Sequence, residues 1–214
     1  MIEETPVPGP SEAVTGLMTA AAVRAAREIG YVGAGTLEFL LGPDGRFFFM
    51  EANCRIQVEH PVTEAVTGVD LVREQLMVAS GARLTLRQED VFPRGAAIEC
   101  RVNAEDPDSG FLPTPGVVEA FLPPSGPFTR VDTDGRSGMT VTAHYDPLLA
   151  KLIVWAPDRG QAIARMDRAL GDFVVESGQV RTTIGFLREV LAHPVFRDAE
   201  HTTSLAETML ARRR

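Results

Sequence analysis

Lysine is nearly absent from this sequence. Of its 21 basic residues, only Lys151 is a lysine. It lies in the apolar run from Leu149 to Trp155, and no glycine-rich loop precedes it, whereas the phosphate-binding lysines of nucleotide sites follow such loops. A complete nucleotide site that depends on lysine is therefore excluded for this chain.

Cysteine is also scarce, and long apolar runs are missing. Cys54 and Cys100 are too few in a chain of 214 residues to form a disulfide framework, so we expect both thiols to be reduced in a cytoplasmic protein. No apolar run approaches the roughly 18 residues that a membrane span requires, and Met1–Thr5 lacks the basic and apolar regions of a signal peptide. The net charge of −8 argues against nucleic acid or an anionic membrane surface as the main partner.

The first part of the chain predicts a helix, a hairpin and a second helix. Ser11 is a suitable N-cap for a helix that runs to about residue 29. The apolar runs Gly35–Leu41 and Phe47–Asn53 are separated by the turn signal Pro43-Asp44-Gly45, so they predict a β-hairpin. A further helix is expected at about residues 70–80. The buried stripe expected on the first helix consists of Leu17, Ala21, Val23, Ala26 and Ile29.

The second part of the chain predicts a mainly antiparallel sheet with packed helices. Short apolar segments separated by Pro and Gly dominate it. Helical patterns follow at about Arg159–Phe173 and Thr183–Ala192, with a short one at Ser204–Ala211. The predicted fold class is therefore α+β. The expected strands are Ala96–Asn103, Gly116–Leu122, Thr129–Asp132, Met139–Thr142 and Ala150–Trp155.

Polar and apolar residues alternate in the segment from Glu51 to Glu59. Side chains alternate between the two faces of a strand, so every second residue shares one face if this segment stays extended. An ordinary half-buried strand produces the same pattern. The residues on the polar face would be Glu51, Asn53, Arg55, Gln57 and Glu59.

The hairpin adds a second carboxylate to this face. If its loop is Pro43–Arg46, Glu38 pairs directly with Glu51. Facing carboxylates are unfavourable by roughly 0.2–1 kcal/mol across a strand pair, and by about 4 kcal/mol at ~4 Å and an effective dielectric constant of ~20. A hard cation such as Mg²⁺ or Mn²⁺ removes this repulsion, and Asn53 offers a third oxygen.

The rest of the polar face suits an anionic substrate. Arg55 and Gln57 are donors for an oxyanion, and Glu59 is a candidate general base. The pattern by itself does not choose between this interpretation and an ordinary strand face.

Several long motifs resemble those of biotin-dependent carboxylases. Met50–Leu71, which reads MEANCRIQVEHPVTEAVTGVDL, is similar to the signature of that family. Gly35–Phe39 resembles the preceding strand, and Arg94–Asp106 resembles the start of the family's C-terminal domain. Phe111–Gly116 and Tyr145–Leu152 continue the similarity, which covers nearly the whole chain. We therefore expect the C-terminal half of a biotin carboxylase.

The resemblance implies an activity and a metal site. Members of this family use ATP to activate bicarbonate as carboxyphosphate and then carboxylate N1 of biotin. By resemblance, Glu38 and Glu51 hold Mg²⁺ or Mn²⁺ together with Asn53, and ATP is bound through this metal.

The resemblance also implies roles for the residues that follow. Arg55, Gln57 and the backbone of Val58 bind bicarbonate, and Glu59 deprotonates it. Arg101 stabilises the biotin enolate. Biotin arrives on a carrier domain or protein, because the biotinylation motif is absent from this sequence and Lys151 does not lie in one. A carboxyltransferase and a second copy of the carboxylase are the other implied partners.

The similarity suggests three segments. Residues 1–88 would be the C-terminal portion of an ATP-grasp domain, 89–200 the biotin carboxylase C-terminal domain, and 201–214 a short helix and tail. The family's phosphate-binding lysines and glycine-rich lid lie upstream of the stretch that matches this chain, so we expect a fragment that is inactive alone.

Two other interpretations remain open at this point. Another ATP-grasp ligase, such as a carbamoyl-phosphate synthetase, shares the metal pattern, although Gln57–His60 and the segment around Arg101 argue against it. A non-catalytic folding or dimerisation module is the second alternative.

Overall fold

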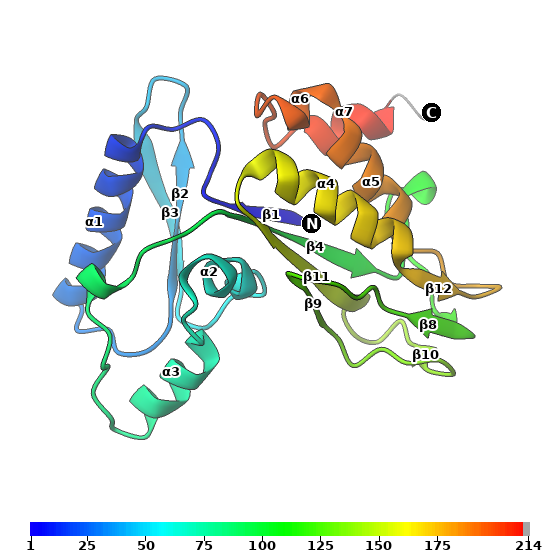
Figure 1. The fold of residues 1–214 in the computed structure, drawn as a ribbon, viewed down its shortest axis with the longest axis horizontal. Coiled ribbons are helices and arrows are strands. Elements are labelled where there is room, and N and C mark those ends of the chain that lie inside the picture. Colours follow the sequence, from blue (N-terminus) through cyan, green and yellow to red (C-terminus); the bar gives the residue numbers. More distant parts are fainter. Residues whose placement is uncertain (212–214) are drawn as a thin grey trace. The chain divides into compact units, whose positions relative to one another are not determined.

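The computed structural model describes residues 1–211, and within them the chain forms two compact units. One unit is Val7–Pro93; the other combines residues 1–6 with the chain from Arg94 onward. Every described strand pairing is antiparallel, and helices pack beside the strands (Figure 1). The expected α+β class is confirmed. No described helix is long and apolar enough to cross a membrane.

The larger unit is built on a four-stranded sheet in the order β1-β4-β11-β9. Its strands are β1 (Ile2–Thr5), β4 (Ala96–Asn103), β11 (Leu148–Ala156) and β9 (Thr129–Asp132). Three short pairs form separate two-stranded sheets: β5 (Glu105–Asp106) with β6 (Leu112–Pro113), β7 (Gly116–Val117) with β10 (Thr140–Val141), and β8 (Ala120–Leu122) with β12 (Val174–Glu176). The helices of this unit are α4 (Arg159–Asp172), α5 (Ile184–Ala192), α6 (Pro194–Arg197) and α7 (Leu205–Ala211), besides a short 3₁₀ turn at Pro107–Ser109. Residues 212–214, the end of the expected tail, lie outside the described residues.

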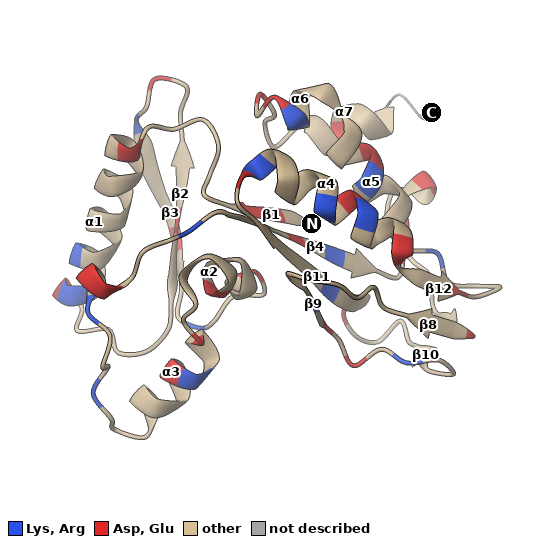
Figure 2. Cartoon of the chain, in the orientation of Figure 1, with Lys and Arg blue, Asp and Glu red and all other residues tan. Residues whose placement is uncertain are grey.

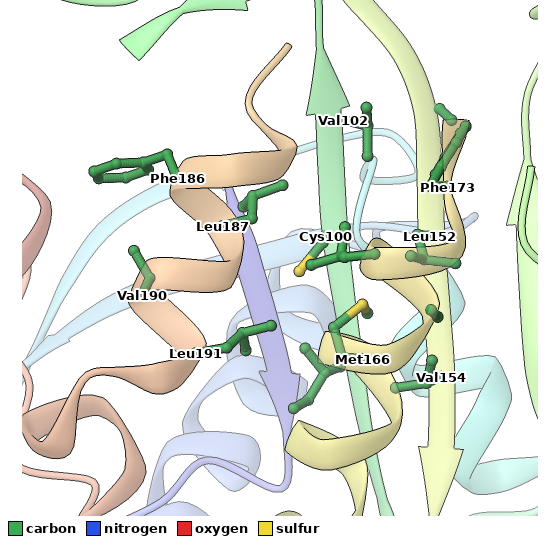
Figure 3. Packing of buried hydrophobic residues seen from close by; sticks show 14 of the residues in the cluster. Cys100, Val102, Leu152, Val154, Met166, Phe173, Phe186, Leu187, Val190 and Leu191 are labelled. Carbon is green, nitrogen blue, oxygen red and sulfur yellow. The ribbon is translucent and has the colours of Figure 1, made fainter. Parts of the chain in front are cut away.

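One face of this sheet forms the hydrophobic core. The even-numbered residues of β4 and those of β11 from Ala150 to Ala156 point to it and are buried, among them Cys100 and Leu152. Met166 of α4 and Leu187 and Leu191 of α5 pack over them (Figure 3). The odd-numbered residues of β4, and those of β11 from Lys151 to Trp155, therefore point to the opposite face.

The strand β1 belongs to this sheet although it precedes the smaller unit in sequence. Residues 1–88 are expected from the sequence to form one segment, yet Ile2–Thr5 pairs with Ala97–Cys100 of β4. Ile2 packs against the core, so burial of its apolar side chain contributes to the stability of this strand pairing. The local pattern of polar and apolar residues does not indicate which distant segment a strand pairs with, so this pairing was not predicted.

A partly buried ion pair connects β1 to the helices. The Arg159 guanidinium donates to both carboxylate oxygens of Glu4, at 2.7 and 3.1 Å. It also donates to the carbonyl oxygens of Phe196 and Arg197 at 2.8 Å and lies over the Phe196 ring. The Arg159 guanidinium, which belongs to α4, thus connects β1 to α6. Such a bidentate, charge-assisted contact is among the stronger polar interactions in proteins.

The smaller unit contains α1 (Glu12–Glu28), β2 (Thr36–Leu41), β3 (Phe47–Asn53), α2 (His60–Thr67), α3 (Leu71–Ala79) and a 3₁₀ turn at Gln88–Asp90. Ser11 caps α1 as expected, since its hydroxyl accepts from the Val14 amide. The helix near 70–80 is confirmed, with Asp70 as its cap. The helix α2 was not expected; Pro61 at its start is the signal for it.

The smaller unit buries little of its apolar surface. Only Pro61, Val62 and Val66 are fully buried in it. The expected stripe of α1 is wrong as a buried stripe: Leu17, Val23 and Ile29 are exposed, while Ala21 and Ala26 are half-buried. The hairpin exposes a further set of large apolar side chains, Leu40, Phe48, Phe49 and Met50.

The two thiols should differ sharply in reactivity. Cys100 is fully buried, and burial, reinforced by the nearby Glu3 carboxylate, raises the pKa of its thiol well above the usual value. Cys54 is exposed. Because the thiolate is the reactive form, we expect one thiol of the native chain to react with Ellman's reagent within minutes and the second only after denaturation. Cys54→Ser should abolish the fast phase; a fast phase that survives this change would show that the β4 core opens readily.

Candidate functional site

Two carboxylates and one amide meet on the β2–β3 hairpin. Glu38 of β2 pairs directly with Glu51 of β3. The Asn53 side-chain nitrogen donates to Glu38 Oε1 and to Glu51 Oε1, each at 2.9 Å. The prediction that both carboxylates lie on one face of adjacent antiparallel strands is therefore confirmed.

The direct pairing depends on a bulge that the sequence did not reveal. Next to the turn, Leu41 pairs with Phe47 and Phe39 with Phe49; the register then shifts so that Glu38 pairs with Glu51. Met50 is the extra residue of this bulge. Without it, Glu38 would oppose Met50, and the Glu51 side chain would point to the other face.

The hairpin turn is also one residue shorter than expected. The Gly42 amide donates to the Arg46 carbonyl at 2.8 Å, so the loop proper is Pro43–Gly45. Asp44 accepts from the Arg46 amide and side chain, and this hydrogen bonding lowers the pKa of the Asp44 carboxyl group. Gly45 has a φ of +78°, which favours glycine. These local features fix the turn, and the bulge then restores the carboxylate pairing.

The donor set fits a hard divalent cation. No group of three or more His, Cys, Asp or Glu side chains suited to a metal occurs among residues 1–211, so the protein would supply only Glu38, Glu51 and Asn53. Mg²⁺ is commonly held in this way, by one or two carboxylates together with water and phosphate oxygens. The Asn53 amide already lies between both carboxylates, and a half-turn of its amide group presents the oxygen instead of the nitrogen.

The segment after β3 is not extended. The prediction that Glu51, Asn53, Arg55, Gln57 and Glu59 share one strand face assumed that it was. The strand ends at Asn53, a turn follows, and α2 begins at His60. Alternation along a strand therefore does not place Arg55, Gln57 and Glu59. Their positions come from the turn and from the start of α2.

This turn presents hydrogen-bond donors. Arg55 Nη1 donates to Gln57 Oε1 and to the Ile56 carbonyl, each at 3.2 Å. The Gln57 amide nitrogen is buried and has no hydrogen-bond partner among the described residues. His60 Nδ1 lies 2.7 Å from the Gln57 carbonyl oxygen and braces the turn. Glu59 occupies the N-cap position of α2 without capping it through its side chain.

Arg101 lies in the larger unit, on β4, and its approach to Arg55, Gln57 and Glu59 remains a prediction. Arg101 Nη2 contacts Glu3 Oε1 at 2.9 Å. Acidic and basic residues occur together on the strands of this sheet (Figure 2). No sequence pattern pointed to Glu3, because its contact with Arg101 depends on the distant pairing of β1 with β4.

The comparisons with known proteins cover both units. Residues 99–208 match the model of the biotin carboxylase C-terminal domain, and residues 1–87 match that of the carbamoyl-phosphate synthase L chain ATP-binding domain. The chain is 49% identical to a biotin carboxylase of Nostoc over 98% of its own length and 46% of that protein. It is 48% identical to biotin carboxylase 1 of Bacillus subtilis over 97% of its length and 46% of that protein.

Solved structures agree. The biotin carboxylase domain of Hydrogenobacter thermophilus 2-oxoglutarate carboxylase superimposes with a TM-score of 0.94 at 43% identity, over 97% of this chain and 46% of that one. A biotin carboxylase subunit of pyruvate carboxylase gives 0.95 at 40% identity, over 100% and 47%. The chain spans about half the length of the relatives it matches, and it belongs to the biotin carboxylase family.

Proposed function

We propose that this chain contributes the metal- and bicarbonate-binding segment of a biotin carboxylase, together with an arginine that faces biotin. The enzyme would carboxylate biotin on a carrier with bicarbonate and ATP, through carboxyphosphate. The observation that carries the proposal is the Asn53 amide bridging Glu38 and Glu51 at 2.9 Å. The Hydrogenobacter domain was solved with MgADP and bicarbonate, which supports the same ligands here.

The hairpin residues would hold the cation. Glu38, Glu51 and Asn53 supply oxygens to Mg²⁺ or Mn²⁺, and the repulsion between the two carboxylates makes the site select a positive charge. When bound, the metal neutralises charge that develops on the phosphates of ATP.

The turn before α2 would bind and activate bicarbonate. The Arg55 guanidinium, the Gln57 amide nitrogen and the Val58 backbone provide donors for its oxygens. The buried Gln57 nitrogen, which has no partner among residues 1–211, would gain one, and this removes the cost of burying it unpaired. Glu59 would accept the bicarbonate proton, so that the bicarbonate oxygen attacks the γ-phosphorus of ATP and displaces ADP.

The carboxyl transfer would use Arg101. Carboxyphosphate gives its carboxyl group to N1 of biotin, phosphate leaves with the N1 proton, and the Arg101 guanidinium stabilises the negative charge that develops on the ureido oxygen. In this scheme residues 1–88 form part of an ATP-grasp domain, 89–200 the C-terminal domain, and 201–214 a terminal helix and tail. The enzyme would work in the cytoplasm as a homodimer with a biotin carrier and a carboxyltransferase.

The test uses a joined enzyme, in which this chain follows the part of the Nostoc biotin carboxylase that precedes its own match. We expect bicarbonate-dependent ADP release with Mg²⁺ and transfer of labelled bicarbonate to free biotin. Glu51→Gln should lower both rates at least about 100-fold, the size of a lost electrostatic contact in a site, whereas Asp44→Asn at the hairpin tip should leave them unchanged.

A second measurement protects this test against a joined enzyme that fails to fold. Mn²⁺ binding to the 214-residue chain, followed by electron paramagnetic resonance, should weaken in Glu51→Gln and not in Asp44→Asn. Equal Mn²⁺ binding by all three proteins would remove the metal site from the proposal. A folded joined enzyme without bicarbonate-dependent turnover would favour a non-catalytic role.

A further inference from the structure

The face of the larger sheet that points away from its core carries a row of charges. Glu3 lies on β1, Glu99 and Arg101 on β4, Lys151 on β11, and Asp132 on β9. The register pairs Glu3 with Glu99, Arg101 with Lys151, and Lys151 with Asp132. Side chains directly opposite or diagonal on one face of a sheet contact one another. Arg101 is therefore one member of a cross-strand network.

The Glu3 carboxylate holds the end of the Arg101 side chain. Because Glu3 pairs with Glu99, it lies diagonal to Arg101 on the same face. Glu3 Oε1 is 2.9 Å from Arg101 Nη2, and the two side chains are 18% and 29% exposed. At this partial burial the contact is screened less than a surface ion pair.

Lys151 repels the Arg101 guanidinium from the other side. It stands directly opposite Arg101 across the β4–β11 pair, and like charges in such positions disfavour each other. Lys151 Nζ lies 3.6 Å from Asp132 Oδ2 on β9, so its charge is drawn toward that edge of the sheet. Attraction by Glu3 and repulsion by Lys151 act in the same direction and turn the guanidinium toward β1.

The backbone of Arg101 is fixed independently of its side chain. Thr183, which is fully buried, donates from its hydroxyl to the Arg101 carbonyl at 3.2 Å and accepts from the Asn103 amide at 3.0 Å. The side-chain torsions are therefore the main freedom left to Arg101. A long side chain that is held in one geometry loses rotamer entropy, and here the network imposes this loss before a substrate binds.

We propose that Glu3 is the positioning residue of Arg101: it aims the guanidinium at the ureido oxygen of biotin. The proposal rests on the function proposed above for Arg101. Glu3 itself touches no reacting atom. Its removal should therefore impair carboxyl transfer to biotin and leave the earlier, biotin-independent formation of carboxyphosphate intact.

The test compares Glu3→Gln with Glu3→Asp and with Glu4→Gln in the joined enzyme. Glu3→Gln should lower biotin carboxylation about 10- to 100-fold, the range that misplaced catalytic groups lose. Bicarbonate-dependent ADP release without biotin should stay within about twofold by the same reasoning. Glu3→Asp should recover part of the loss. Glu4→Gln is the matched control, because Glu4 faces Arg159 on the opposite side of the strand; it should lower the melting temperature without separating the two rates.

A spectroscopic arm works on the 214-residue chain alone. In ¹⁵N spectra of the arginine side chains, the Arg101 signal, assigned with Arg101→Lys, should show restricted rotation that Glu3→Gln releases and Glu4→Gln does not. An unchanged Arg101 signal in Glu3→Gln, or a parallel fall of both rates, would overturn the positioning role. If the unsubstituted joined enzyme is inactive but Glu3→Gln still releases Arg101, the ion pair stands and the proposed function fails.

Discussion

The 214-residue chain alone is expected to release no ADP above background when it is given ATP, Mg²⁺, bicarbonate and free biotin. Phosphoryl transfer needs the triphosphate held by cationic side chains and backbone amides while a metal neutralises charge. This chain has the hairpin site, but its only lysine, Lys151, lies in β11 beside Asp132. Missing positioning and electrostatic contributions of several kcal/mol each lower the rate by many powers of ten.

The measurement is a coupled ADP assay on the purified chain, with the joined enzyme as its positive control at equal concentration. Mn²⁺ binding by the chain shows that the hairpin is folded in the sample. Bicarbonate-dependent turnover by the chain alone that disappears in Glu59→Gln would show that these residues include a complete nucleotide site, and the expectation would be wrong.

The exposed apolar surface of the smaller unit also leads us to expect that the chain is inactive alone. The helices α1 and α3 have no buried residue, and Phe48, Phe49 and Met50 of the hairpin are more than half exposed. A stable unit normally buries more of its large apolar side chains than this. The exposed apolar residues agree with a chain that spans about half the length of its relatives.

Local sequence signals predicted most of the elements correctly. The Ser11 cap, the hairpin around Pro43-Asp44-Gly45 and the helix at about residues 70–80 were predicted correctly, because each depends on neighbours in sequence. The pairing of Glu38 with Glu51 was also predicted, although from a longer loop. The true turn is one residue shorter and a bulge at Met50 compensates, so two features that parity alone does not report cancel each other.

Features that depend on contacts between segments far apart in the sequence were not predicted. The alternation from Glu51 to Glu59 indicated a strand, yet the chain turns after Asn53 and Pro61 starts a helix. The apolar stripe of α1 has helical periodicity, but its large residues are exposed. Periodicity identifies the face of a helix that can be buried, and it does not identify the segment that would cover that face. The pairing of β1 with β4 brings Glu3 to Arg101. Nothing in the sequence of β1 indicates that it pairs with β4.

Replacing Glu59 with Gln in the joined enzyme is expected to lower bicarbonate-dependent turnover by about 10²- to 10⁴-fold, the usual contribution of a general base. Glutamine keeps the size of the side chain and cannot accept the bicarbonate proton. Glu59 stands at the N-cap of α2, and its side chain makes no capping hydrogen bond. The effect should therefore fall on kcat, with the KM for ATP nearly unchanged.

The check is steady-state ADP release at saturating bicarbonate for the parent, Glu59→Gln and Glu12→Gln. Glu12 lies in the first turn of α1 and is the charge-matched control, which should behave like the parent. Equal melting temperatures for the three proteins would confine the difference to chemistry. Turnover by Glu59→Gln within about tenfold of the parent would be too small a loss for a general base, and the proton would then have to go to another acceptor near Arg55 and Gln57.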